Sequence, residues 1–183
     1  AAKSLLKKLR KNYHLILISK SENFTFKPLL HEVATGAFNP KIASENIEHA
    51  LKHPSFTFVK GTATKIDFKQ QNVLIGKKKV HYAFLVVALG SEPNFFKIPG
   101  AKTHALPLST LKDAFAIKKA LINVAKKKSP RIIIAGGGPL GSELSTEIDS
   151  FIKSFTKDYL IVIVNKDSEI LPGISERFRN KVE

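Results

Sequence analysis

A glycine-rich segment between residues 131 and 151 limits the fold more than any other part of the sequence. The β-branched run Ile132–Ile134 leads into Ala-Gly-Gly-Gly-Pro-Leu-Gly, and a helical pattern continues to Phe151. The glycines at 136, 138 and 141 have G-x-G-x-x-G spacing, which between a strand and a helix is typical of a dinucleotide-binding turn. A glycine-rich turn in an unrelated α/β core is the alternative. The segment therefore predicts a strand, a tight turn and a helix whose N-terminus can face phosphate groups.

Each glycine of this turn has its own expected role. Gly136 permits the tight turn, Gly138 lets the backbone approach a pyrophosphate, and Gly141 lets helix and strand pack closely. Pro139 and Leu140 lie between them and are included in the expected cofactor site.

The amino-acid composition argues against some classes of function for this chain. The net charge of +15 comes mostly from lysine, since arginine occurs only at positions 10, 131, 177 and 179. The lysines are scattered and not interleaved with aromatic residues on one face, which argues against a nucleic-acid site. A solvated basic surface explains them, and it is compatible with attraction to an anionic membrane. The sequence has no cysteine, so it offers neither disulfides nor a thiolate nucleophile.

Histidines do not indicate a metal site. His49 and His53 are four residues apart near Glu45, but Pro54 follows at once and no second acidic residue is evident. His31-Glu32 lacks the second histidine of a zinc-protease motif. We expect no metal. Nor does any run of 18 apolar residues or any secretory signal occur.

Hydrophobic periodicity predicts an alternation of helices and strands. The run Tyr82–Leu89 reads as a parallel strand buried on both faces, and the proline-rich stretch from Ser91 to Pro107 reads as a linker. An antiparallel β excursion is expected from three short strands, at 56–59, 63–68 and 72–75. The other expected elements are helices at 3–10, 42–51 and from Ser109 or Thr110 to 125, strands at 15–18 and 159–164, and a loop at 24–36 that becomes a short helix ended by Gly36.

Three segments, Phe26–Gly36, Leu85–Ala101 and Ile133–Leu144, together resemble type II NADH dehydrogenases. Those are single-subunit, membrane-associated flavoenzymes that pass electrons from NADH through FAD to a quinone. The resemblance implies an α/β fold with two Rossmann-like FAD- and NAD(P)-binding domains, both incomplete in this chain. Residues 1–108 would be a partial FAD-binding domain with an antiparallel β excursion and a linker, and residues 109–183 a partial NAD(P)-binding domain. The first glycine-rich loop would precede Ala1, so we expect the isolated segment not to hold FAD.

The resemblance also implies site residues. Glu143 matches a glutamate near the nicotinamide and isoalloxazine rings; the alternative is a first-turn acid favoured by the helix dipole. Segment Phe26–Leu30 matches one close to FAD. The remaining expected contacts are Ser19 and Lys20 at the FAD ribose, Thr62 and Ala63 at the adenine, Ala88, Leu89 and Gly90 beside the flavin and its phosphates, Gly136, Gly138 and Gly141 at the NAD(P) pyrophosphate, and Asn165 at the NAD(P) ribose.

Two of these positions depart from the family pattern. Ser19 and Asn165 stand where an acid usually holds a ribose. An acid at 165 would repel a 2′-phosphate, whereas asparagine does not, and Lys166 could pair with one, so we expect NADH use with relaxed preference.

The resemblance implies a quinone substrate and a peripheral position at the cytoplasmic face of the cell membrane, with membrane contact through parts outside this chain. A homodimer is left open. Two alternatives also remain: another two-dinucleotide reductase, of the sulfide:quinone or ferredoxin reductase type, and a nucleotide-binding redox module without turnover.

Overall fold

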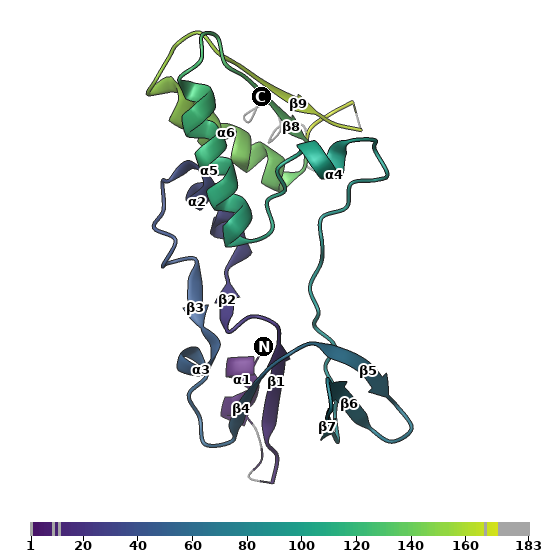
Figure 1. The fold of residues 1–183 in the computed structure, drawn as a ribbon. Helices are drawn as coiled ribbons and strands as arrows, with labels where there is room; N and C mark the ends of the chain where they lie inside the picture. Colours follow the sequence, from purple (N-terminus) through teal and green to yellow (C-terminus); the bar gives the residue numbers. More distant parts are fainter. Residues whose placement is uncertain (1, 9, 11, 167, 172–183) are drawn as a thin grey trace. The chain divides into compact units, whose positions relative to one another are not determined.

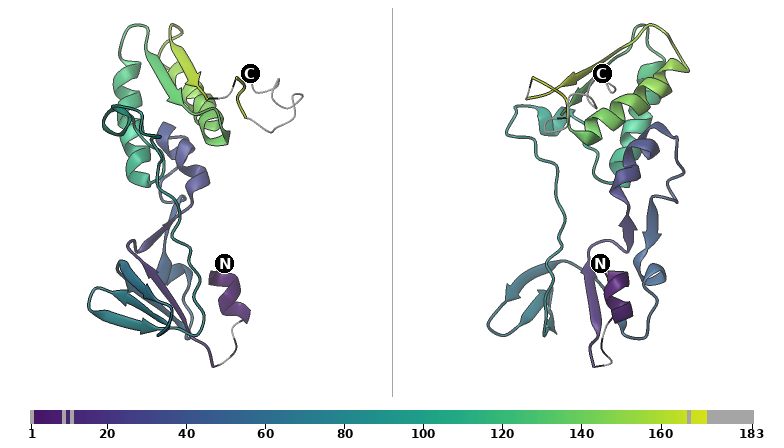
Figure 2. Two further views of the ribbon diagram at one scale, coloured as in Figure 1. Left: turned by 90° about the vertical axis from the view of Figure 1, so that its right-hand side faces the viewer. Right: turned by 180° about the vertical axis from the view of Figure 1, so that it is seen from behind.

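The computed structural model describes residues 2–8, 10, 12–166 and 168–171 and has a mixed α/β fold. The chain forms two compact units, each of which is built from two stretches of sequence (Figures 1 and 2). Unit 1 contains the residues up to 25 and those from 44 to 91, and unit 2 contains residues 26–43 and those from 92 onward. The expected division into nucleotide-binding domains at residue 108 stays a prediction, because compactness alone does not show which nucleotide a unit binds.

Unit 1 contains a parallel strand pair. The strand β1 (Leu15–Ser19) pairs with β4 (Phe56–Lys60), with Leu15 opposite Phe56 and Ser19 opposite Lys60. Their aliphatic, β-branched and aromatic residues suit a pleated, half-buried surface. The helix α1 (Ala2–Lys8) buries Leu6, so the helix predicted at 3–10 is confirmed for residues 3–8, while residue 9 lies outside the described residues. The predicted first strand is confirmed by β1. Because the strands are parallel, their carboxyl ends lie at the same edge.

The second sheet of unit 1 is antiparallel, in the order β5 (Ala63–Asp67), β6 (Asn72–Ile75), β7 (Lys78–His81). It buries Val73 and Ile75. The predicted β excursion is confirmed for its second and third strands. The prediction was wrong for the first, because residues 56–59 pair in parallel with β1 instead. The strand β7 was not predicted, since Lys-Lys-Val-His carries one apolar residue and pairs through its backbone.

The predicted helix at 42–51 was also wrong in its first half. Residues 44–46 form β3 (Ser44–Asn46), which pairs with β2 (Asn23–Thr25). Only α3 (Ile47–Ala50) is helical, and the Asn46 side chain caps it by accepting a hydrogen bond from the His49 N–H at 3.1 Å. Pairing with a strand distant in sequence therefore outweighs the local helical pattern.

The run Tyr82–Leu89 does not form the buried strand that its sequence predicts. No strand includes these residues, and Phe84, Val86 and Leu89 are 77%, 78% and 85% exposed. A buried parallel strand needs hydrogen-bonded neighbours, and the described part of unit 1 offers the run none: β1 and β4 pair with each other alone. A ring contact of 5.9 Å between Tyr13 and Phe84 holds the start of the run.

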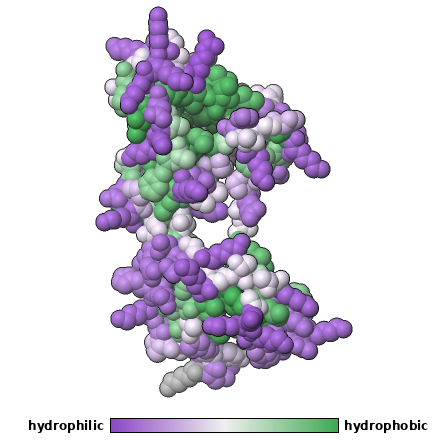
Figure 3. Space-filling view, viewed as in Figure 1, coloured by the Kyte–Doolittle hydropathy of each residue, from purple (hydrophilic) through white to green (hydrophobic). Residues whose placement is uncertain are grey.

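Unit 2 contains a second parallel pair, β8 (Arg131–Ala135) and β9 (Leu160–Val164), as predicted. The inward face of this pair packs on α5 (Leu111–Ala125) and α6 (Pro139–Lys153) in one core (Figure 1). The other face is exposed and apolar at Ile133, Leu160 and Val164, and it contributes to the hydrophobic area over β8 and β9 in Figure 3. The buried core residues of unit 2 include Ala114, Ile117, Leu121, Ile134, Ile148 and Ile152.

The predicted start of α5 is confirmed in detail. Thr110 is the N-cap: its side chain accepts from the Asp113 N–H, and the Asp113 carboxylate accepts from the Thr110 N–H. This reciprocal capping box satisfies two backbone donors that would otherwise lack partners. Before it, the linker contains one short helix, α4 (Ala101–His104).

The segment 26–43 belongs to unit 2 because its short helix is part of that core. A 3₁₀ turn (Lys27–Leu29) leads into α2 (Leu30–Thr35), where Leu30 and Val33 are each 1% exposed. Gly36 ends the helix with φ +88°, a left-handed conformation that favours glycine. The predicted loop, short helix and glycine stop are confirmed. In the described residues, no helix is long and apolar enough to cross a membrane.

A polar cluster joins α6 to the start of β9. Asp149 accepts hydrogen bonds from Lys153 at 2.6 Å and from the Tyr159 hydroxyl at 2.5 Å. These two bonds, that from Lys153 first, lower the pKa of Asp149 below its usual value. A carboxyl whose pKa is lower in the folded state stabilises the fold at pH values above its unfolded pKa, and this contribution is lost as the pH falls through the folded pKa.

We therefore expect Asp149→Asn to lower the melting temperature at neutral pH and to lose this effect as the pH falls below about 4. Thermal unfolding followed across an acid pH series checks this. The control is Glu92→Gln, which removes an exposed carboxylate elsewhere in unit 2. An Asp149→Asn effect of the same size at every pH would contradict the assignment.

Candidate functional site

The glycine turn of unit 2 joins β8 to α6. Gly136 follows the strand with φ +118°, a conformation that side-chain-bearing residues rarely adopt, and its N–H donates to the Val164 carbonyl at 2.8 Å. The chain thus leaves the sheet and reverses within three residues. Strand, turn and helix occur as the sequence predicts.

Gly141 is required by packing. A Cβ at this position would lie 1.9 Å from the Gly136 carbonyl oxygen and 3.6 Å from the Ile134 Cγ2. Since the first of these is a backbone atom, no side-chain rearrangement could relieve the collision. The first turn of α6 therefore rests directly on the end of β8.

Gly138 has the opposite surroundings. It is the N-cap of α6, it has no side-chain cap, and a Cβ built on it would meet nothing within 4 Å. Pro139 follows at the first helical position, so the N–H groups of Leu140 and Gly141 are left as donors at the helix N-terminus. Open space in front of uncapped N–H groups and a positive dipole end is what a phosphate requires. These residues fit the pyrophosphate of a dinucleotide.

Asn165, the first residue after β9, holds the turn together. Its Oδ1 accepts from the Gly137 N–H at 3.1 Å, and its Nδ2 donates to the Glu169 carbonyl at 2.8 Å. The Leu171 N–H adds a bond of 2.6 Å to the Gly137 carbonyl. Both ends of the Asn165 amide are therefore occupied by protein groups. Its expected contact with a ribose stays a prediction. The sequence did not indicate that Asn165 also forms hydrogen bonds within the turn.

Glu143 lies on the second turn of α6, five residues after the N-cap, and its side chain is 55% exposed. No acidic residue occurs in the first turn of the helix. The alternative interpretation of Glu143 as a first-turn acid favoured by the helix dipole is therefore wrong, because that effect falls off within the first turn. Its Oε2 lies 3.7 Å from His31 Nδ1 on α2.

In unit 1, the parallel pairing of β1 and β4 brings four of the predicted residues to one edge. Ser19 ends β1, and its carbonyl accepts from the Gly61 N–H at 2.9 Å, so Lys20 follows one strand at this edge and Thr62 and Ala63 follow the other. The Ser19 hydroxyl accepts from the Ser21 N–H at 3.2 Å. This edge could contact an adenosine group.

Ala88, Leu89 and Gly90 are not brought into a strand beside this edge, contrary to expectation. They are exposed, and Gly90 has φ +75°. The described part of unit 1 also has no glycine-rich turn that leads into a helix, so it lacks a phosphate cradle like that of unit 2. These residues do not fit a whole flavin dinucleotide without further protein groups.

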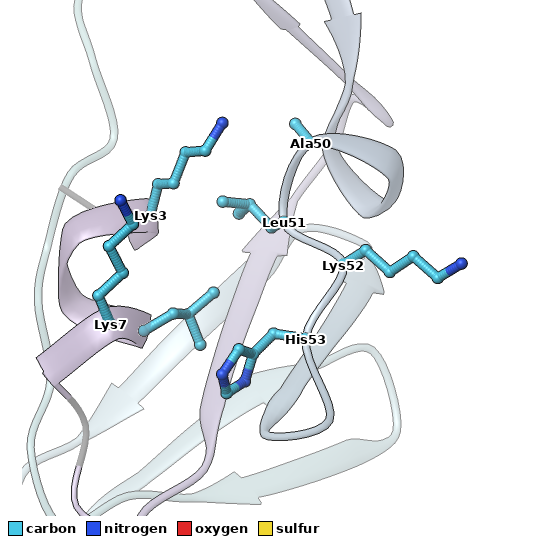
Figure 4. A pocket seen from close by; sticks show the side chains of 7 residues that line it. Lys3, Lys7, Ala50, Leu51, Lys52 and His53 are labelled. Carbon is cyan, nitrogen blue, oxygen red and sulfur yellow. The ribbon is translucent and has the colours of Figure 1, made fainter.

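A hollow of about 190 Å³ in unit 1 lies between α1 and residues 50–53. Lys3, Lys7 and Lys52 line it, but Figure 4 shows Lys52 pointing away from Lys3 and Lys7, so the three ammonium groups do not converge on an anion. None of the predicted site residues lines it. The described ranges contain no group of three or more acidic, histidine or cysteine side chains that could hold a metal ion.

A family model of the pyridine nucleotide-disulphide oxidoreductases matches residues 1–183. The chain belongs to this family. Members bind FAD and NAD(P)H. The expected resemblance is confirmed by curated relatives. An external alternative NADH-ubiquinone oxidoreductase of Yarrowia lipolytica is 28% identical over 98% of this chain and 37% of its own length. The demethylphylloquinone reductase NdbB of a Synechocystis species is 29% identical over 92% and 43%.

Solved structures agree on the fold. The NDH2 of Plasmodium falciparum in complex with NADH superposes with a TM-score of 0.82 at 23% identity, over 93% of this chain and 40% of that one. The sulfide:quinone oxidoreductase of Aquifex aeolicus gives 0.73 at 21% identity, over 88% and 40%. The chain thus spans about two fifths of the length of these relatives.

The packing at Gly141 predicts the outcome of adding one methyl group. We expect Gly141→Ala to lower the free energy of unfolding by about 3 kcal/mol, since α6 must move away from β8. Chemical denaturation measures this. The control is Gly138→Ala, where φ is −79° and the space is open, so its stability should change little. Equal losses in the two variants would contradict the packing argument.

The open space at Gly138 predicts a separate effect on binding. We expect Gly138→Ala to weaken NADH binding about tenfold or more, because a methyl group there keeps phosphate away from the helix N–H groups. Titration of the full-length protein with NADH measures the dissociation constant. Ser150→Ala, an exposed change on the same helix, is the control. Unchanged affinity in Gly138→Ala would show that the nucleotide does not approach this turn.

Proposed function

We propose that this protein is an FAD-dependent NAD(P)H:quinone oxidoreductase, in which a hydride passes from the nicotinamide to the flavin and electrons pass on to a membrane quinone. The observation that carries the proposal is the uncapped N-terminus of α6 behind the open Gly138 position. Membership of the family and the names of the relatives, which act on ubiquinone and demethylphylloquinone, support it. In this proposal residues 1–108 contribute to FAD binding and residues 109–183 to NAD(P)H binding.

The residues of unit 2 account for how the nicotinamide cofactor would be held. The N–H groups of Leu140 and Gly141 would bind the pyrophosphate, with Gly138 giving access. Glu143, on the next turn of α6, would lie toward the ring end, because a carboxylate facing the phosphates would repel them. When bound, NAD(P)H supplies the hydride, and the protein positions it.

The ribose end favours relaxed nucleotide preference. Asn165 carries no charge that would repel a 2′-phosphate, its amide is already bonded within the turn, and the exposed Lys166 follows it. We propose that the protein uses NADH and accepts NADPH.

The cellular setting is also part of the proposal. The net charge of +15 supports attraction to an anionic membrane surface, and we propose a peripheral enzyme at the cytoplasmic face of the cell membrane. Membrane contact would involve parts outside this chain.

A nucleotide-binding redox module without turnover is the second candidate. The absence of an acid at Ser19 and Asn165 favours it, since both ribose positions lack the usual charged partner.

One experiment separates the two candidates. We expect the purified full-length protein to carry flavin, whose visible absorption is lost on anaerobic addition of NADH and recovers when a quinone is added. We also expect kcat/KM for NADPH to lie within about tenfold of that for NADH, since no carboxylate at 165 discriminates against the phosphate. Persistent flavin absorption in the presence of NADH would favour the non-catalytic module, and strict NADH selectivity would contradict the role given to Asn165.

A further inference from the structure

The imidazole of His31 is held between two carboxylates in unit 2. Its side chain is 12% exposed, and its Nδ1 is buried and makes no hydrogen bond within the described part of the chain. Nδ1 lies 3.7 Å from Glu143 Oε2, and Nε2 lies 3.8 Å from Glu32 Oε1. These separations exceed a hydrogen bond but allow an ion pair when the imidazole is protonated.

A second contact, one helical turn further along, fixes how α2 and α6 lie against each other near His31 and Glu143. Thr35, four residues after His31 on α2, donates to the carboxylate of Glu147, four residues after Glu143 on α6, at 3.2 Å. Residues four apart lie on the same face of a helix, so the two contacts form adjacent rungs between α2 and α6. Since Leu30 is buried in the core, α2 holds the imidazole at a set place beside Glu143.

We propose that His31 is a positioning residue for Glu143 and makes the reaction pH-dependent. A histidine changes charge between about pH 5 and 8. The protonated imidazole attracts the half-exposed Glu143 carboxylate toward α2, and the neutral imidazole releases it toward the ring end of the nicotinamide cofactor. The part of this inference that concerns rate rests on the proposed function, whereas the coupling between the two side chains does not.

Other charged groups surround the pair. On α2 the neighbour is Glu32, and on α6 it is Glu147, which is already bonded to Thr35. On α5, Lys118 brings its ammonium group beside Gly36 at the end of α2. Lys27 lies on the 3₁₀ turn before α2. Among these groups, Glu143 combines contact with His31 and solvent exposure, so it is the group free to change position with the charge on the imidazole.

The first test measures coupling without any substrate. Melting temperatures of the full-length protein, His31→Gln, Glu143→Gln and the double variant are compared at pH 5.5 and pH 8.5. We expect the two single effects to be less additive at pH 5.5 than at pH 8.5, because only a protonated imidazole can form an ion pair with the carboxylate. Additivity at both pH values would overturn the inference. Should His31→Gln not fold, Glu143→Gln still tests the pair, because it should destabilise more at pH 5.5 than at 8.5, unlike Glu92→Gln.

The second test measures the rate of flavin reduction by saturating NADH across the same pH range in rapid-mixing experiments. We expect the wild-type rate to change at least threefold between pH 5.5 and 8.5 and His31→Gln to remove most of that change. His49→Gln, an exposed histidine of α3, is the matched control and should keep the wild-type profile.

The two tests distinguish failure of this inference from failure of the proposed function. A wild-type profile in His31→Gln would show a merely structural contact and overturn the inference. No flavin reduction by NADH in the wild-type protein would contradict the proposed function, and the stability comparison would then still decide whether His31 and Glu143 are coupled.

Discussion

The direct contact between the first turn of α6 and the end of β8 determines how the rest of unit 2 can be arranged. A Cβ at Gly141 would lie 1.9 Å from the Gly136 carbonyl oxygen, so helix and strand approach as closely as their backbones allow. This approach turns the N-terminus of α6 toward the carboxyl end of the parallel pair. It also leaves Gly138 in open space, where the helix N–H groups are accessible. The same glycine-based packing thus stabilises the unit and leaves the N–H groups of the α6 N-terminus accessible.

The helix α2 adds a second constraint, because it joins a distant part of the sequence to this arrangement. Its residues Leu30, Val33 and Ala34 are almost completely buried in the core that also contains α5 and α6. The polar face of α2 meets α6 at Glu143 and Glu147. The segment expected from the family resemblance to lie near the flavin is therefore packed in the same unit as the glycine turn expected to hold the nicotinamide cofactor. One rigid core can position residues relevant to both.

Sequence patterns predicted the structure correctly where neighbouring residues determine it. The same patterns gave wrong predictions where pairing with a distant strand determines the structure. The turn at 136–141, the capped start of α5 at Thr110 and the stop at Gly36 all depend on residues within about five positions, and all three were predictable. The run Tyr82–Leu89 has the composition of a buried strand, but a strand also needs neighbours, and composition does not reveal whether they are present. Residues 44–46 show the converse, since pairing with β2 makes a strand from a helical pattern.

The site was predictable to the same extent. Residues adjacent in sequence to the glycine turn were identified, whereas the partners that act on them from elsewhere were not. Asn165 was recognised only by its place after β9, and its bonds to Gly137 and Glu169 depend on the loop that follows it. His31 was considered only as an incomplete zinc motif, although its neighbour across α2 and α6 is Glu143. In both cases a side chain from another element contacts α6 or the turn before it. Such side chains can adjust the glycine turn and Glu143 from distant parts of the sequence, so substitutions at these positions can change the surroundings of the turn while the glycine motif stays intact.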